Sequence, residues 1–258
     1  DPVTATTTGL MDIRTRQWAR ALTDLAGLQE EMLPAIEPAS VKIGSLTTEA
    51  ARALSLTAGI PIINGCGDAG ATTLGSFCDE EGDVSLYLGT SGWVARVASE
   101  QSLDSDRPVY RLAHPSITKI IEVLPILSAG AATAWLRNLL GKTLEESEIL
   151  LGEADRNPPN LVFLPYLAGE RSPFSDLAVR ASFVGLDTAH GAAELAYSVL
   201  EGVSFSIRRN LLALDPNGQG QVTLVGGGAT SRVWPQLIAD ILERPIRVLS
   251  DPASATSL

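Results

Sequence analysis

Strand-like and helix-like segments alternate along most of this sequence, and that alternation limits the fold more than any other feature. Apolar runs at residues 222–225 and 245–249 have the length of buried strands. Between them, residues 231–242 have helical spacing behind a serine that can cap a helix. The longest helix is expected at 192–214, with an apolar ridge along one side. This order predicts an α/β layer fold.

The remaining segments extend the same pattern. Residues 1–10 and 165–180 are expected to be irregular, with a strand edge as the alternative for the first ten. Near residue 202 a close neighbour is expected, because a glycine inside a helix costs about 1 kcal/mol relative to alanine. Helices are predicted at residues 15–27, 48–54, 69–77, 130–140 and 143–153, and strands at 60–63 (buried), 83–88, 93–98, 109–112, 117–127 and 161–164.

Charge and composition exclude several classes of function. Nineteen basic and 30 acidic residues give a net charge of −11 without a basic patch, which disfavours nucleic acid and anionic membranes as partners. A nucleotide remains an option, since backbone N–H groups can hold phosphates. Two cysteines and two histidines are too few for a disulfide framework or a zinc cluster.

The sequence also bears on location. It contains no apolar run long enough to span a bilayer and no signal-peptide pattern. We therefore expect a cytoplasmic protein with reduced thiols. Because the first residue is Asp1 rather than methionine, we also expect a fragment or a processed form.

Two glycine-flanked motifs carry the residues on which chemistry would depend. Asp68 follows Asn-Gly-Cys-Gly, directly after an apolar run, and Thr90 and Ser91 lie between Gly89 and another glycine. A carboxylate that accepts a proton and a loop that wraps phosphate are two parts that a kinase needs. The structural alternatives are a helix N-cap for Asp68 and an ordinary hairpin turn for the Thr-Ser pair.

A third motif, Gly-Gly-Gly-Ala-Thr-Ser at residues 226–231, lies between a predicted strand and a predicted helix. Three glycines let a ligand touch the backbone, and the helix N-terminus behind them favours anions or a stacked ring. A plain strand-to-helix turn explains the run equally well. No Gly-Lys-Ser/Thr follows, so the motif is not a P-loop. Glu170 and Arg171, in Gly-Glu-Arg-Ser-Pro, are interpreted as a structural ion pair, with a catalytic role as the alternative.

Taken together, these motifs resemble the FGGY family of carbohydrate kinases, most closely its xylulokinase-like members, over essentially the whole chain. Residues 181–201 are similar to the family's second signature, in which Glu-Leu and Ser-Val-Leu-Glu follow Ala-Ser-Phe-Val-Gly-Leu at fixed spacing. Residues 163–173 resemble the segment that precedes it in xylulokinases and gluconokinases. Residues 226–240 resemble the family's adenosine motif.

The resemblance implies a ribonuclease H-like (actin-like ATPase) fold, with a mixed sheet flanked by helices and with ATP and sugar between two lobes. Residues 1–80 would be the C-terminal tail of the N-terminal sugar-binding lobe. Residues 81–258 would be the C-terminal nucleotide-binding lobe, cut before its last helix. Asp68 matches the catalytic base. The nucleotide contacts implied by the resemblance are Gly89, Thr90, Ser91, Gly130, Gly227, Gly228, Ala229, Ser231 and Arg232. Mg²⁺ would accompany ATP, with no protein residue assigned as its ligand.

The function implied is ATP-dependent phosphorylation of a pentulose such as xylulose by the full-length protein. The family's first phosphate motif has no counterpart here, and relative to the family the chain lacks most of the sugar-binding lobe. Because most sugar contacts should lie in that lobe, this chain alone is expected to be inactive. The alternatives are a gluconate, ribulose or glycerol/polyol kinase, or a non-catalytic actin-like nucleotide-binding module. Ala69 and Ala134 stand where glycerol kinases have glutamine, which argues against glycerol. Retention of Asp68 favours a kinase over the module, and a homodimer is one assembly that the sequence allows.

Overall fold

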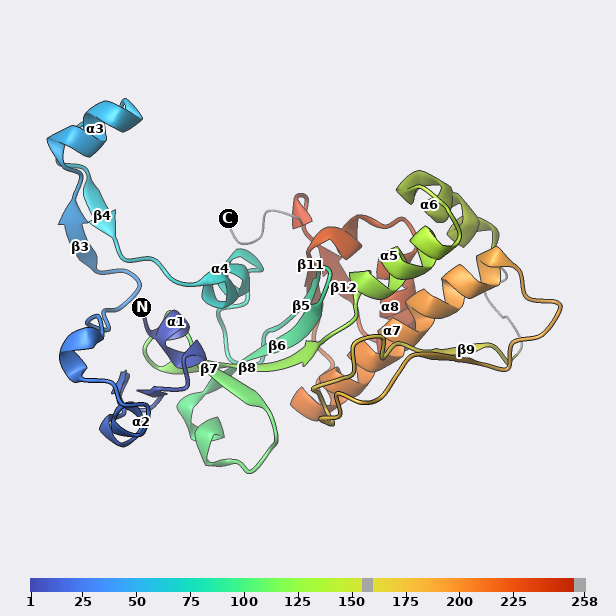
Figure 1. The fold of residues 1–258 in the computed structure, drawn as a ribbon, viewed down its shortest axis with the longest axis horizontal. Coiled ribbons are helices and arrows are strands. Elements are labelled where there is room, and N and C mark those ends of the chain that lie inside the picture. The colour runs from blue at the N-terminus through green and yellow to red at the C-terminus, as the bar shows by residue number, and fades with distance from the viewer. Residues whose placement is uncertain (155–159, 253–258) are drawn as a thin grey trace.

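The centre of the structure is a six-stranded mixed sheet with the strand order β12-β11-β5-β6-β8-β7 (Figure 1). The computed structural model describes residues 1–154 and 160–252. Strands β5 to β8 pair antiparallel, whereas β11 pairs parallel with both β5 and β12. The strands are β5 (Val84–Leu88), β6 (Gly92–Ser99), β7 (Tyr110–Ala113), β8 (Lys119–Ile126), β11 (Val222–Val225) and β12 (Ile246–Val248). The α/β mixed sheet predicted from the sequence is therefore confirmed.

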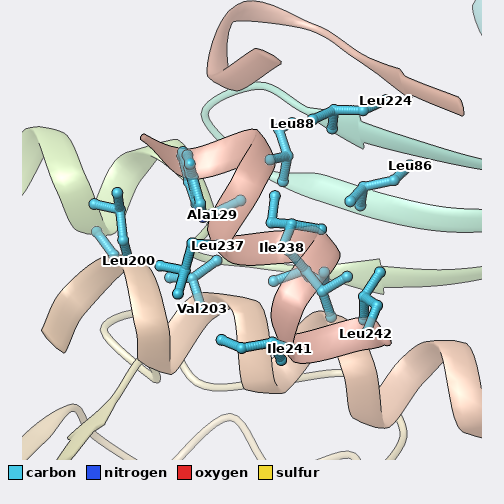
Figure 2. Packing of buried hydrophobic residues seen from close by; sticks show 14 of the residues in the cluster. Leu86, Leu88, Ala129, Leu200, Val203, Leu224, Leu237, Ile238, Ile241 and Leu242 are labelled. Atoms are coloured by element: carbon cyan, nitrogen blue, oxygen red, sulfur yellow. The ribbon is translucent and has the colours of Figure 1, made fainter. Parts of the chain in front are cut away.

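Four helices pack with this sheet around one hydrophobic core. They are α5 (Gly130–Leu139), α6 (Leu144–Glu153), α7 (Ala192–Leu214) and α8 (Trp234–Leu242). Figure 2 shows sheet side chains such as Leu86 and Leu224 facing Ile238 and its neighbours on α8, with Val203 of α7 beneath them. The predicted helices are confirmed here. Thr143 and Glu146 form a capping box at the start of α6, as the sequence Thr-x-x-Glu allows.

The close neighbour expected at Gly202 is the two-stranded sheet of β9 (Val162–Leu164) and β10 (Ser182–Val184). A Cβ atom at Gly202 would overlap the carbonyl oxygen of Phe163. The glycine thus lets the middle of α7 lie directly against the β9 backbone. Strand β10 itself was not predicted from the sequence.

The first 80 residues differ more from expectation. They contain α1 (Pro2–Thr7), β1 (Met11–Asp12), β2 (Gln17–Trp18), α2 (Arg20–Leu25), η1 (Glu30–Met32), β3 (Lys42–Ser45), α3 (Thr48–Leu54), β4 (Pro61–Ile63) and α4 (Asp68–Gly75). The prediction that residues 1–10 are irregular is wrong, because the chain begins with helix α1. Asp1 caps this helix by accepting a hydrogen bond from Thr4 N at 3.1 Å, and Pro2 occupies its first turn. The helix predicted at 15–27 is too long, because β2 pairs with β1 before α2 begins.

Strand β4 forms as predicted, but it is not buried. It pairs only with β3, and both strands project away from the central sheet with α3 (Figure 1). Ile62 and Ile63 remain 40% and 51% exposed because no other element of the described chain covers them. An apolar run fixes the tendency to form a strand, whereas its burial depends on what packs against it.

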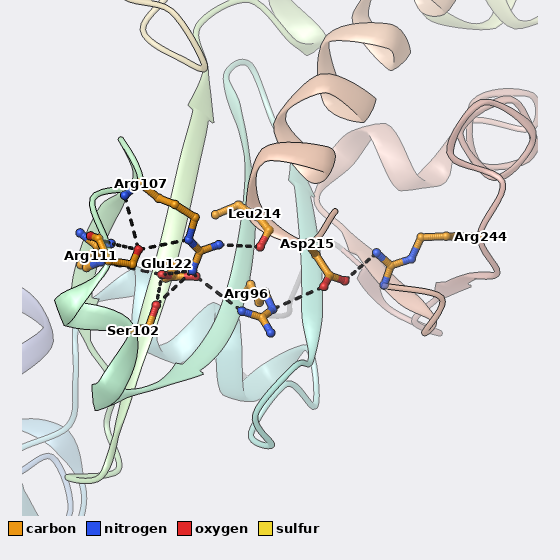
Figure 3. A network of polar contacts seen from close by, with 9 residues as sticks. Arg96, Ser102, Arg107, Arg111, Glu122, Leu214, Asp215 and Arg244 are labelled. Carbon is orange, nitrogen blue, oxygen red and sulfur yellow. Dashed lines mark hydrogen bonds and ion pairs between the residues drawn. The ribbon is translucent and has the colours of Figure 1, made fainter. Parts of the chain in front are cut away.

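A buried ionic network ties the edge of the sheet to the end of α7 (Figure 3). Glu122 of β8 is completely buried and accepts two hydrogen bonds from Arg107, at 2.8 and 2.9 Å. Arg96 and Arg111 lie within 4 Å of the same carboxylate. Arg107 also donates to the Leu214 carbonyl, and the 3-10 helix η2 (Glu100–Asp104) adds the Ser102 hydroxyl as a donor to Glu122. The carboxylate is therefore compensated in the interior, as a buried charge must be.

The Gly202 contact yields a stability prediction. Gly202→Ala should lower the free energy of unfolding by about 1–3 kcal/mol, because overlap with the β9 backbone outweighs the better helix propensity. Gly152→Ala in α6 is the matched control, since its added Cβ would meet no atom within 4 Å. That control should leave stability unchanged or raise it by up to about 1 kcal/mol. Urea unfolding of both variants measures the difference, and a stabilised Gly202→Ala would contradict the packing argument.

Candidate functional site

A cavity of about 480 Å³ lies where the β5–β6 hairpin, the glycine-rich turn after β11 and helices α5 to α8 meet. Six of the residues predicted from the sequence line it: Gly89, Thr90, Gly130, Gly227, Gly228 and Ser231. Its wall includes the apolar side chains of Leu151, Leu200 and Trp234. A larger hollow of about 560 Å³ at residues 18–33 contains none of the predicted site residues. The first cavity is therefore the candidate site.

The hairpin turn and the start of α5 are joined through the backbone. Gly130 N donates to Gly89 O and Ala131 N donates to Thr90 O, both at 2.9 Å. A Cβ atom at Gly130 would lie 2.5 Å from Gly89 O, so only glycine permits this contact. The expected hairpin is confirmed, and the turn is held against the helix N-terminus, where the helix dipole favours negative charge.

The three glycines after β11 have different roles. Gly226 has φ of +91°, and a Cβ there would lie 2.6 Å from Leu88 O. A Cβ at Gly228 would lie 2.8 Å from the Leu88 side chain, whereas one at Gly227 would meet nothing within 4 Å. Gly226 and Gly228 thus serve packing on β5. Gly227, at the start of η3 (Gly227–Thr230), leaves open space at the cavity wall.

The other predicted nucleotide contacts lie outside the cavity lining. Ser91 is exposed, and its backbone carbonyl closes the hairpin turn by accepting a hydrogen bond from Gly89 N. Ala229 is buried in the core. Arg232 is exposed, and its backbone N–H donates to Glu148 Oε2 of α6 at 2.9 Å. Ser231 Oγ accepts from Val233 N and Trp234 N, both at 3.3 Å. The expected cap is wrong in its position, because the N-cap residue of α8 is Val233.

Two further helices contribute side chains that the sequence motifs did not identify. Thr133 and Arg137 of α5 line the cavity, as do Ser147 and Glu148 of α6. The residues of α5 follow Gly130 at intervals of three and four, which places them on one helical face. That spacing was visible in the sequence, but only the packing of α6 against α7 shows that this face borders a cavity.

Asp68 is the first residue of α4, and its carboxylate is exposed to solvent. Gly67 occupies the N-cap position, while Asp68 Oδ1 accepts from Ala69 N at 2.8 Å. The start of α4 lies tightly on α1, since a Cβ at Gly67 would be 2.6 Å from Thr4 Oγ1. Asp68 is thus held by its own helix and by α1, and it does not line the cavity.

Glu170 anchors the end of β8, just before the turn into α5. Its side chain is buried, and Oε1 accepts from Arg171 N at 2.9 Å and Leu127 N at 3.3 Å. Burial raises the pKa of this carboxyl group, while these N–H donors act in the opposite direction. The expected ion pair with Arg171 is wrong, because the carboxylate bonds backbone amides and the Arg171 side chain is exposed.

Within residues 1–154 and 160–252, no group of three or more His, Cys, Asp and Glu side chains could hold a metal ion. None of the helices in this part of the chain is long and apolar enough to cross a bilayer.

Comparisons with known proteins agree with one another. The profile of the FGGY family of carbohydrate kinases, C-terminal domain, matches residues 84–258, and that of the N-terminal domain matches residues 1–75. A xylulose kinase of Escherichia coli is 32% identical over 236 residues, which are 90% of this chain and 48% of that protein. A gluconokinase of Bacillus subtilis is 27% identical over 95% of this chain and 50% of its own length. The chain spans about half the length of these relatives.

Solved structures give the same result. A crystal structure described as a xyloylose kinase from Brucella ovis superimposes with a TM-score of 0.89 at 33% identity. It covers 99% of this chain, and the match takes up 54% of the other. A Plasmodium falciparum glycerol kinase has a TM-score of 0.88 at 21% identity over all of this chain and 52% of its own, which shows a common fold.

Glu170 allows a pH-dependent prediction. Because folding raises the pKa of Glu170, its contribution to stability falls as pH rises from the ordinary glutamate pKa of about 4.3 through the raised value. Glu170→Gln keeps an acceptor for the two amides without the charge, so it should gain stability relative to wild type as pH rises from 4 to 7. Glu170→Ala leaves buried N–H groups unpaired and should cost about 1–3 kcal/mol at either pH. Urea unfolding at both pH values tests this, and an unchanged pH profile in Glu170→Gln would contradict it.

Proposed function

The chain belongs to the FGGY family of carbohydrate kinases, and from this membership we propose that the full-length protein transfers a phosphoryl group from ATP to a sugar hydroxyl. The acceptor we propose is a pentulose such as xylulose, because relatives at about 30% identity are named xylulose kinases. The observation that carries the proposal is the cavity at which the Gly89–Thr90 turn, the start of α5 and Gly227 meet.

The chemistry of the cavity suits a nucleotide. Its apolar residues, Leu151, Leu200 and Trp234, offer a surface for the base. At the other end, the dipole of α5 favours negative charge beside the Thr90 turn, while Gly130 N and Ala131 N themselves donate to the carbonyls of that turn. Mg²⁺ would come with the nucleotide phosphates and neutralise part of their charge. We assign no protein residue as its ligand.

Asp68 is proposed as the general base that accepts the proton of the sugar hydroxyl. Its carboxylate is exposed, and its backbone is fixed by the packing of α4 on α1.

Residues 1–80 would belong to the sugar-binding lobe and residues 81–258 to the nucleotide-binding lobe. The described residues lack the first phosphate motif of the family, so the proposed activity belongs to the full-length protein. A cytoplasmic location and a homodimer are further parts of the proposal.

Gluconate, ribulose and glycerol are the alternative acceptors. Because one relative is named a gluconokinase, gluconate remains an alternative acceptor. Ala69 and Ala134 argue against glycerol, since glycerol kinases have glutamine at these positions. The full-length protein should phosphorylate xylulose faster than ribulose, gluconate or glycerol in an assay coupled to ADP release. If another acceptor reacted faster, that compound would replace xylulose as the proposed substrate. ATP binding without transfer to any of the four would favour the non-catalytic module.

Substitution of the proposed base gives the second test. Asp68→Asn in the full-length protein should lower kcat by at least about 100-fold, because general base catalysis contributes about 10²–10⁴. ATP affinity should stay near the wild-type value, since Asp68 does not line the nucleotide cavity. Asp106→Asn is the control, because Asp106 is also exposed and lies in the loop between η2 and β7. Full turnover by Asp68→Asn would remove Asp68 from the mechanism.

A further inference from the structure

Helix α6 is the part of the cavity wall that packing holds least firmly. Among its ten residues, Leu144–Glu153, all of which the structure describes, Leu151 alone is buried, whereas α8 buries five. Leu144 and Ile149 are 64% and 53% exposed. A void of about 30 Å³ also remains where α5, α6 and α7 meet, so the atoms around it lack contacts on one side. Apolar packing by itself therefore leaves α6 room to shift.

A hydrogen bond ties this helix to another wall of the cavity. Arg232 N donates to Glu148 Oε2 at 2.9 Å, and the two residues are 84 positions apart in the chain. Within residues 1–154 and 160–252, it is the one hydrogen bond that joins α6 to an element beyond its own capping turn. Glu148 and Ser231, which precedes Arg232, both line the cavity. The bond thus connects the α6 wall to the glycine-rich turn.

Glu148 shares a helical face with Leu151, which follows it by three residues. Leu151 lines the cavity together with Leu200 and Trp234, the apolar surface proposed for the base. Because one turn of helix is held together by its own hydrogen bonds, a fixed Glu148 also fixes Leu151 beside that surface. A wall that is in place before binding lowers the ordering cost that a ligand must otherwise overcome.

We propose that Glu148 is a positioning residue that holds α6 against the glycine-rich turn and thereby keeps the apolar end of the cavity formed for the nucleotide base. It accepts the bond from Arg232 N and acts through Leu151, without touching the nucleotide. Arg232, which the family resemblance implied as a nucleotide contact, then contributes its backbone N–H to the shape of the cavity. This inference rests on the proposed function, and it adds a residue from outside the glycine motifs.

The first measurement concerns the hydrogen bond and requires no nucleotide. In the full-length protein, Glu148→Ala should speed hydrogen exchange in the peptide that contains residues 230–234 by at least about threefold. Glu148→Gln should leave that rate near the wild-type value, because an amide oxygen accepts the same bond. Glu145→Ala is the matched control, since Glu145 is exposed on the same helix. Unchanged exchange in Glu148→Ala would show that the bond does not hold the two walls together and would overturn the proposal.

The second measurement concerns nucleotide binding. Glu148→Ala should weaken binding of ATP and of adenosine by the same factor, about three- to tenfold, as the net free energy of one partly exposed hydrogen bond allows. The KM for ATP should rise similarly, with kcat and the KM for xylulose near their wild-type values. Glu148→Gln and Glu145→Ala should bind both ligands as the wild-type protein does. Calorimetry and steady-state kinetics measure these quantities, and thermal unfolding verifies that each variant is folded.

Each other outcome contradicts the inference in a distinct way. A loss for ATP without a loss for adenosine would mean that Glu148 acts on the phosphates. Equal losses in Glu148→Ala and Glu148→Gln would mean that its charge matters rather than the hydrogen bond. If the wild-type protein bound neither ligand, the proposed function would fail and this role with it, whereas failure of this role alone shows only in the variants.

Discussion

The docking of α5 on the β5–β6 hairpin is the contact on which the candidate site depends. Two backbone hydrogen bonds join Gly130 and Ala131 to the carbonyls of Gly89 and Thr90. A side chain at Gly130 would push the helix off the turn, because its Cβ would meet Gly89 O at 2.5 Å. Without that contact the turn and the α5 face bearing Arg137 would not border one cavity. The absence of a side chain at Gly130 thus allows the two segments to border the same cavity.

Close backbone approach recurs wherever distant segments meet. Gly226 and Gly228 lie against Leu88, and Gly67 lies against Thr4. In each case the glycine allows one backbone or side chain to touch another without an intervening Cβ. Gly227, by contrast, leaves open space at the wall of the cavity. A glycine run therefore combines two functions that its sequence alone does not distinguish.

Buried carboxylates hold the strand that leads into the site. Glu122 fixes the middle of β8 through Arg107, and Glu170 fixes its end through backbone amides. Both are compensated, but by different means, since guanidinium groups neutralise charge whereas N–H groups only solvate it. Burial therefore raises the pKa of Glu170. The two carboxylates thus add side-chain contacts to a strand whose register is set by its pairing with β6 and β7.

The sequence by itself determined the features set by near neighbours in the chain. The strands of the sheet, the 23-residue helix α7 and the motifs containing Asp68, Thr90 and Gly227 were all predicted from local pattern. Only the tertiary structure decided that β4 stays exposed, that Glu170 bonds amides rather than the Arg171 side chain, and that Thr133 and Arg137 line a cavity. The reason is physical: backbone conformation follows from local residue types, whereas burial, ion pairing and cavities depend on which distant segments come into contact.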